Sequence, residues 1–168
     1  MAVGPFSAVK YHPIAGFQLG TTAAGIKTPG RQDLVVMQAQ AGSSMAGVFT
    51  ANAFCAAPVH LCRRHLLDDS PLALVINTGN ANAGTGAAGD ADALTSCNEL
   101  ALALNLKSSQ VLPFSTGVIG EKLPIDKIVK SLPTAIEALD INGWQEAALG
   151  ILTTDTRTKG ASVQVEHL

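Results

Sequence analysis

The feature that most constrains the fold lies at residues 72–89, where a short apolar run leads into a glycine-rich loop and then into a helical pattern. The apolar run is Leu72–Ile76, and the loop that follows reads NTGNANAGTGAAG. Asp90 then stands where a helix N-cap is favoured. Strand, glycine loop and helix in this order are typical of α/β folds that hold an anion at the helix N-terminus. The sequence predicts such a unit and leaves open what its loop binds.

One interpretation of this loop is a dinucleotide site, because Gly84, Gly86 and Gly89 have the spacing GxGxxG. That motif needs its first glycine directly after the strand, and an acidic residue about 20 residues further on. Here seven residues separate Ile76 from the first glycine, and the next apolar run, Val111–Phe114, ends in Ser-Thr-Gly. A dinucleotide-binding module using residues 84–89 is therefore kept as the alternative hypothesis.

Composition and charge exclude several classes of partner. Charged residues make up 14% of the chain and the formal net charge is −2, so we expect no nucleic-acid partner. A mean hydropathy of +0.27 argues against disorder. We find no secretory signal peptide and no run of about 18 apolar residues. The expectation is a cytoplasmic protein without membrane contact.

Alternating strand and helix patterns predict an α/β fold of the layered α+β kind, in which helices cover a mixed sheet. The expected strands are Phe17–Ala24, Leu34–Gln40, Met45–Asn52, Pro71–Ile76, Val111–Phe114 and Ser162–Leu168. The expected helices are Ala57–Leu67, a segment that runs from Asp90 to Leu104, a segment that begins near Pro124, Thr134–Leu139 and Gly143–Leu152. The strands at 34–40 and 45–52 are expected to form a hairpin.

The cysteines and histidines indicate no particular chemistry. Cys55, Cys62 and Cys97 fit no metal-ligand spacing, so we expect reduced thiols and no metal site. Cys62 and His65 lie three residues apart on one helix face. That spacing leaves open either a nucleophile with its base or a buried thiol beside a histidine.

Two polar segments follow buried elements. FSTGVIG at 114–120 places a hydroxyl and a glycine amide at the end of a predicted strand. Such a pair can stabilise a developing oxyanion, although an ordinary Ser/Thr turn has the same composition. TTDT at 153–156 groups hydroxyls and a carboxylate after a helical segment, and a local cap or turn is the alternative there.

Taken together, these segments resemble one family. INTGNANAGTG (76–86), LPFSTGVIGEKLP (112–124) and TTDTRTKGAS (153–162) are similar to segments of the ornithine acetyltransferases, also called glutamate N-acetyltransferases. HPIAGFQLGTTAAGIKTPGRQDLVVM (12–37) and GVFTANAFCAAPV (47–59) match as well. The resemblance covers nearly the whole chain, in order and with the expected gaps.

The resemblance implies an enzyme of arginine biosynthesis that transfers acetyl from N2-acetyl-L-ornithine to L-glutamate, releases ornithine and needs no cofactor. Its precursor cuts itself at an Ala–Thr bond into α and β segments, and the freed N-terminal threonine of the β segment is the nucleophile. The oxyanion hole maps onto Thr116 and Gly117 of the α segment. A substrate-contacting threonine maps onto Thr154, with Thr153 as the fallback. An α2β2 heterotetramer is implied, and acetyl-CoA as a further acetyl donor stays open.

The chain departs from the family pattern in two places. Thr158 stands where the family usually has proline, and the family's Lys-Gly segment and Ala–Thr bond do not occur in the 168 residues. Residues 1–168 are therefore expected to form the N-terminal, α-segment domain, truncated before the cleavage site and inactive alone. The Ala161–Ser162 bond resembles a cleavage site, which makes Ser162 an alternative nucleophile. A non-catalytic scaffold is the third hypothesis.

Overall fold

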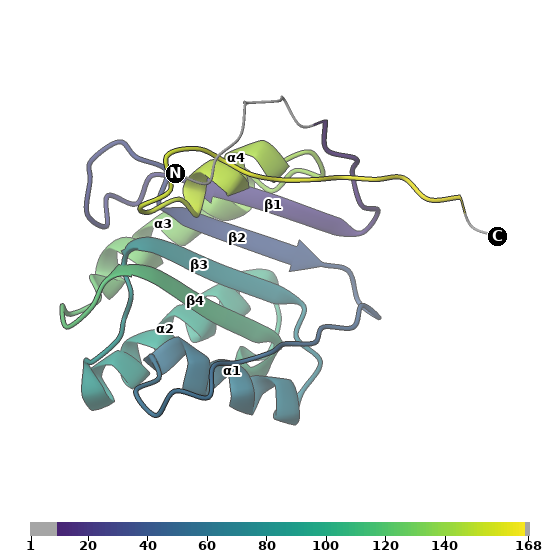
Figure 1. Cartoon of the computed structure of the whole chain (residues 1–168). Coiled ribbons are helices and arrows are strands. Elements are labelled where there is room, and N and C mark those ends of the chain that lie inside the picture. The colour runs from purple at the N-terminus through teal and green to yellow at the C-terminus, as the bar shows by residue number, and fades with distance from the viewer. Residues whose placement is uncertain (1–9, 167–168) are drawn as a thin grey trace.

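The structure is a computed structural model that describes residues 10–166. Within that range the strands β1 (Phe17–Thr22), β2 (Leu34–Ala39), β3 (Ala73–Asn80) and β4 (Val111–Val118) form one sheet, in the order β1-β2-β3-β4. The helices are α1 (Ala57–Asp68), α2 (Gly86–Leu104), α3 (Ile125–Glu137) and α4 (Trp144–Gly150), with a short 3₁₀ turn η1 (Ser108–Gln110) before β4. Figure 1 shows the sheet in the middle of the molecule, with α1 and α2 below it and α4 above it.

The sheet is mixed, which confirms the predicted fold class. β1 pairs with β2 and β2 pairs with β3 in antiparallel register, whereas β3 and β4 run parallel. A parallel pair needs a crossover connection, and α2 supplies it between β3 and β4. The strand–loop–helix unit predicted at residues 72–104 is therefore present, and its second strand is β4.

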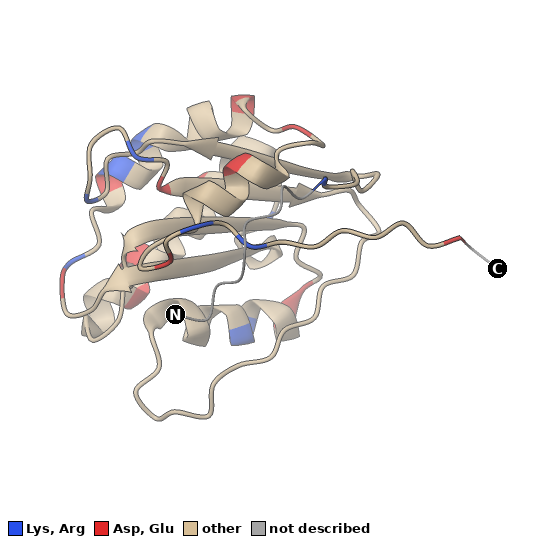
Figure 2. Cartoon of the chain, turned by 45° about the horizontal axis from the view of Figure 1, so that its top comes forward, with Lys and Arg blue, Asp and Glu red and all other residues tan. Residues whose placement is uncertain are grey.

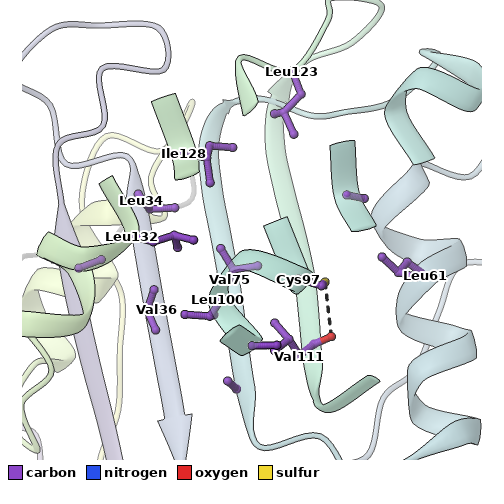
Figure 3. Close-up of a cluster of buried hydrophobic side chains, with 14 of the residues drawn as sticks. Leu34, Val36, Leu61, Val75, Cys97, Leu100, Val111, Leu123, Ile128 and Leu132 are labelled. Carbon is purple, nitrogen blue, oxygen red and sulfur yellow. Dashed lines mark hydrogen bonds between the residues drawn. The ribbon is translucent and has the colours of Figure 1, made fainter. Parts of the chain in front are cut away.

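The main core lies between one face of the sheet and the helices α1, α2 and α3. Side chains alternate between the two faces of a strand, so Leu34 and Val36 of β2 enter this core while Val35 points to the opposite face. Figure 3 shows aliphatic side chains from strands and helices meeting in one layer. Its labelled members include Val75, Leu100, Val111, Leu123, Ile128 and Leu132.

The other face of the sheet is covered only in part. The short helix α4 packs on β1 and β2 through Ala147, against Leu19 and Val35. The approach is close, because a Cβ placed on Gly150 would lie 2.6 Å from Val35 Cγ2. Over β3 and β4 this face is open, and a hollow of about 600 Å³ lies there with Phe114 in its lining.

Helix α1 binds the outer edge of β4 through two side chains. Cys62 Sγ lies 3.2 Å from the carbonyl oxygen of Pro113, and His65 Nδ1 lies 2.7 Å from that of Val111. Burial raises the pKa of the Cys62 thiol to about 12. Since the thiolate is the nucleophilic form, this cysteine is a packing residue and not a nucleophile at neutral pH.

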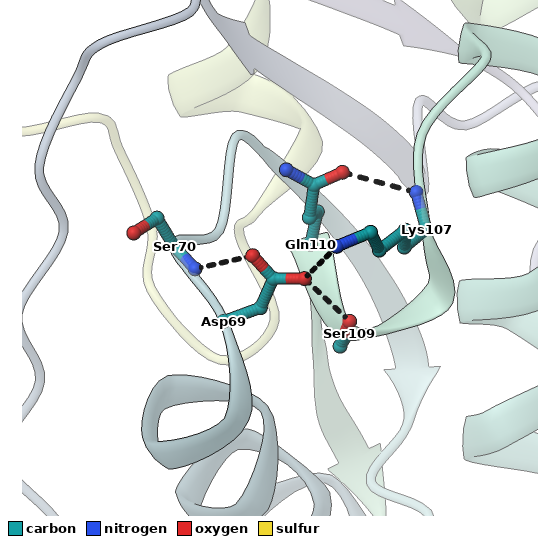
Figure 4. A network of polar contacts seen from close by, with 5 residues as sticks. All are labelled: Asp69, Ser70, Lys107, Ser109 and Gln110. Atoms are coloured by element: carbon teal, nitrogen blue, oxygen red, sulfur yellow. Dashed lines mark hydrogen bonds and ion pairs between the residues drawn. The ribbon is translucent and has the colours of Figure 1, made fainter.

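A polar network joins the chain just before β3 to the chain just before β4 (Figure 4). The Asp69 carboxylate accepts hydrogen bonds from Ser70 N at 2.8 Å, from Ser109 Oγ at 3.0 Å and from Lys107 Nζ at 3.3 Å. These donors lower the pKa of Asp69, and the backbone N–H of Ser70 contributes most. We call these four residues the Asp69 network.

Two strand predictions are wrong. Residues 45–52 have no strand, because β1 and β3 already occupy both edges of β2 and leave no partner for the expected hairpin. β1 pairs with β2 instead, across the turn at 23–33. Residues 162–166 have no strand either, and both Val163 and Val165 are 80% exposed, without a neighbouring strand in the described part of the chain. The predicted last two positions, 167 and 168, lie outside the described residues.

Several predicted boundaries also shift. Asp90 is not an N-cap: α2 begins four residues earlier, at Gly86, and Thr85 is its N-cap residue. β3 and β4 each run four residues beyond their predicted ends, because strand pairing continues through the polar and glycine residues. The segments 125–132 and 134–137 form one helix, α3, although Pro133 lies inside it.

Candidate active site

A cavity of about 500 Å³ opens where the parallel strands β3 and β4 reach their carboxyl ends. In open α/β sheets ligands bind outside the carboxyl ends of the strands. The wall comes from the β1–β2 loop, from both strands and from the segment after α4. Its residues are Lys27, Thr28, Arg31, Asp33, Thr78, Gly79, Thr116, Gly117, Val118, Thr153 and Thr154.

All four site residues predicted from the sequence line this cavity. Thr116 and Gly117 come from the end of β4, and Thr153 and Thr154 come from the segment that follows α4. The structure does not bring Ser162 to the same place: its Oγ accepts a hydrogen bond from His12 N at 2.8 Å, and it lines other hollows.

An irregularity in strand pairing shapes the cavity wall. Thr78 pairs with Thr116 and Gly79 pairs with Gly117, but Asn80 faces both Thr116 and Val118. Such bulges bend a strand, re-aim its side chains and are common beside active sites. The bulge therefore falls at the two residues predicted to form an oxyanion hole.

Gly117 is required at its position for two reasons. Its φ of +142° belongs to a region that side chains rarely adopt, and a Cβ there would lie 2.3 Å from Gly79 C and 2.5 Å from Asn80 N. Gly79, with φ of +100°, is the residue that it approaches. Gly79 of the glycine loop therefore allows the backbone to pack closely beside the end of β4.

Buried asparagines hold the bulge in place. Asn77 Nδ2 donates to the carbonyl oxygen of Asn80 at 2.8 Å, and Asn77 Oδ1 accepts from Ser115 Oγ at 2.6 Å. Asn80 Nδ2 lies 3.1 Å from the carbonyl oxygens of Glu121 and Lys122. These side chains are bonded to protein atoms, so they brace the site. Their role could not be assigned from the sequence.

The glycine loop continues this bracing. Asn82 is fully buried, its backbone N donates to Asn80 Oδ1 and its Nδ2 donates to the Gly89 carbonyl oxygen, each at 2.8 Å. A Cβ on Gly89 would lie 1.9 Å from Thr85 Oγ1. Gly89 therefore serves close packing of the helix start, and none of the three GxGxxG glycines lines the cavity at the strand ends.

Charged residues of the β1–β2 loop form one side of the cavity. The buried Asp33 carboxylate accepts from Ala24 N and Ile26 N, both at 2.6 Å, which fixes the loop. Arg31 Nη2 donates to the carbonyl oxygen of Leu152 and ties this loop to the segment that carries Thr153 and Thr154. Lys27 Nζ lies 3.6 Å from Glu121 Oε2.

The charged residues are spread over the molecule and do not form one large charged surface. Figure 2 shows Lys, Arg, Asp and Glu dispersed over helices and loops, and the four strands contain none of them. Residues 10–166 contain no group of three or more His, Cys, Asp and Glu that could hold a metal ion. Among residues 10–166, no helix is long and apolar enough to cross a membrane.

The fold is that of known acetyltransferase structures. The structure of ornithine acetyltransferase from Mycobacterium tuberculosis, complexed with ornithine, aligns with a TM-score of 0.81 and 37% identity, covering 86% of this chain and 78% of that one. The arginine biosynthesis bifunctional protein ArgJ from Bacillus halodurans aligns with a TM-score of 0.77 and 33% identity, covering 84% and 74%.

Sequence comparison identifies the family. Residues 18–167 match the ArgJ family model, and the chain belongs to the ArgJ family. It is 53% identical to the arginine biosynthesis bifunctional protein ArgJ of Pseudomonas fluorescens (strain Pf0-1) and 52% identical to that of Pseudomonas syringae pv. tomato, each over 167 residues. These matches cover 99% of this chain and 41% of each relative, so the chain spans about two-fifths of their length.

Proposed function

We propose that the chain is the α segment of an enzyme that transfers acetyl from N2-acetyl-L-ornithine to L-glutamate in arginine biosynthesis. The observation that carries this proposal is that Thr116, Gly117, Thr153 and Thr154 line one cavity at the strand ends. Membership of the ArgJ family supports it, as does the ornithine named in the structure from M. tuberculosis. The compartment we propose is the cytoplasm.

The proposed chemistry assigns Thr116 and Gly117 to the acetyl carbonyl. Attack on that carbonyl carbon turns its oxygen into an oxyanion, which the Thr116 hydroxyl and the Gly117 N–H stabilise by donating hydrogen bonds. The intermediate then collapses, ornithine leaves with its amine protonated, and an acetyl-enzyme remains. The amine of glutamate then attacks the acetyl ester, the ester C–O bond breaks, and N-acetylglutamate leaves while the nucleophile regains its hydroxyl. Thr154, or Thr153 in its place, contacts the amino-acid part of the substrate.

The nucleophile in this proposal is the N-terminal threonine of a second, β segment, released by autocatalytic cleavage of the precursor. Its own α-amine acts as the base that accepts the hydroxyl proton. Because the 168 residues lack this threonine, we expect them to be inactive alone. No cofactor is required, and acetyl-CoA is a candidate second donor for glutamate acetylation.

The open face of the sheet is where we propose that the β segment packs. The hollow over β3 and β4 is lined largely by apolar side chains, and Phe114 and Ile151 at its margin are 42% and 43% exposed. Thr116 lines both this hollow and the cavity at the strand ends. A segment seated there reaches the oxyanion hole directly, and pairing of two such units gives the proposed α2β2 assembly.

The test is Thr116→Ala in the full-length enzyme, meaning these residues followed by the second segment. Removal of one oxyanion donor costs on the order of 10²–10³ in turnover, so acetyl transfer should fall by that factor. The rate of self-cleavage in Thr116→Ala is a secondary readout. Thr116→Ser keeps the hydroxyl and is the control. Wild-type transfer rates in Thr116→Ala, with the protein folded, would contradict the proposal.

A further inference from the structure

We propose that Thr78 is a further substrate-contacting residue of this site, and that its hydroxyl hydrogen-bonds the acyl group held by Thr116 and Gly117. The inference rests on the proposed acetyl transfer and adds a residue to which neither the sequence nor the family resemblance gave a role. Three observations support it. The Thr78 hydroxyl is buried without a hydrogen-bond partner among residues 10–166, Thr78 pairs with Thr116 across the two strands, and Thr78 lines the cavity.

Thr78 has a buried hydroxyl without a partner. The residue is only 1% exposed, and its Oγ1 makes no hydrogen bond to any atom in residues 10–166. Its backbone is fixed, because the Thr78 N–H donates to the Asp33 carbonyl oxygen at 2.9 Å. Buried polar groups in folded proteins are nearly always hydrogen-bonded. We therefore infer that this hydroxyl has a partner other than residues 10–166, such as a bound substrate.

The strand register places the Thr78 side chain on the same face of the sheet as the Thr116 side chain. Thr78 and Thr116 are paired across β3 and β4, and paired residues of parallel strands project to the same face. Their neighbours Asn77 and Ser115 project to the opposite face, where the two side chains hydrogen-bond at 2.6 Å. The side chains of Thr78 and Thr116 are therefore neighbours on the same face of the sheet.

Thr78 also lines the same cavity as Thr116 and Gly117. Adjacent strands lie about 4.8 Å apart, so an acyl oxygen bound at Thr116 lies close to the side chain of Thr78 as well. The acyl group that the proposed reaction brings to this point offers that oxygen. Bound substrate would give the unpartnered hydroxyl a partner, and the strand already holds Thr78 beside the acyl group before binding.

The experiment compares Thr78→Val and Thr78→Ser in the full-length enzyme, because valine keeps the branched shape of threonine and removes only the hydroxyl. Thr21→Val is the matched control: Thr21 Oγ1 is also buried and unpartnered within the described residues, but it lines a hollow between β1 and α4. We expect Thr78→Val to lower kcat/KM for acetyl transfer by about tenfold or more, mainly through kcat. Thr78→Ser should stay within about threefold of wild type, and Thr21→Val should equal wild type.

The thermal midpoint separates this role from a structural one. A hydroxyl without a partner in the free protein contributes no hydrogen bond to the fold, so Thr78→Val should not lower the midpoint. A lowered midpoint together with lost activity would overturn the inference, because the hydroxyl would then support the fold. Wild-type kcat/KM in Thr78→Val beside an impaired Thr116→Ala would overturn this inference alone. Wild-type rates in Thr116→Ala would overturn the proposed function and this inference with it.

Discussion

The two ends of the β3–β4 pair are built from different chemistry. At the amino end the paired residues Ala73 and Val111 are fully buried and the register is regular. The chain outside this end is joined by the half-exposed, charged Asp69 network. At the carboxyl end the pair carries Thr78 and Thr116, the register is bulged, and the bracing groups are buried, neutral asparagine amides.

One strand pair thus serves two purposes, packing at its amino end and ligand binding at its carboxyl end. An apolar end packs against helices and can keep ideal pairing, because no group there has to reach a ligand. A polar end must leave hydroxyls and amides available, so its own shape has to be fixed by other groups. Buried neutral amides do this without the desolvation penalty of a charge, whereas a charged network suits the end that water reaches.

The strongest test of this contrast is Gly117→Ala at the carboxyl end. The added Cβ meets the Gly79 backbone and the φ of +142° is unfavourable, so the bulge has to shift. We expect acetyl transfer to fall by about 10³-fold or more, with a loss of stability, because the oxyanion donors move. Gly120→Ala is the control: its φ is +75° but nothing lies within 4 Å of the added Cβ. Transfer assays and urea unfolding in which both variants behave alike would contradict the close-approach argument.

At the amino end the expected effect is on stability alone. Leu100 of α2 is fully buried in the cluster that contains Val75 and Val111 (Figure 3). Leu100→Ala should lower the free energy of unfolding by about 2–5 kcal/mol, measured by urea denaturation. Leu102, on the same helix, is 79% exposed, so Leu102→Ala should change little. A reduced kcat in Leu100→Ala, at a temperature where the variant is folded, would contradict the view that the amino end affects stability alone.

The smallest effect is expected from Asp69→Asn, which removes the charge from the network at the amino end. The pKa of Asp69 is lowered from 3.8, so its ionised form stabilises the folded state above about pH 3.8, and that contribution is lost as the pH falls through the lower, folded-state value. Thermal midpoints of wild type and variant should therefore differ slightly at neutral pH and converge in acid. Asp68→Asn is the control, because it makes the same charge change at a residue outside the Asp69 network and should not show this pH dependence. A difference that does not vary with pH would show that the charge is not involved.

Local pattern was enough to predict the fold class and most elements, but not the strand ends. The run Leu72–Ile76 marks a strand because its residues are apolar, whereas Asn77–Asn80 belong to β3 only because β4 pairs with them. The false strand at 45–52 has the opposite cause. Its apolar residues indicate a preference for burial, and the strand order leaves no edge of β2 for it to pair with.

Site residues that belong to a recognisable motif could be predicted from the sequence, whereas residues whose role depends on strand register could not. Thr116, Gly117, Thr153 and Thr154 came from segments that resemble the family, and they meet at one cavity. Thr78 stands in the same quoted motif as the glycines, but its importance depends on which residue of β4 faces it. Arg31 acts through a contact to Leu152, more than a hundred residues away, which no local pattern encodes.

The contacts between α1 and β4 also bear on how the chain avoids self-association. β4 forms one edge of the sheet, and an exposed edge strand is a template for pairing with another chain. Along its first half the carbonyl oxygens of Val111 and Pro113 are occupied by His65 and Cys62, and Pro113 has no N–H to donate. A foreign strand therefore finds neither free acceptors nor a continuous row of donors there. The helix that packs the core also protects that edge from aggregation.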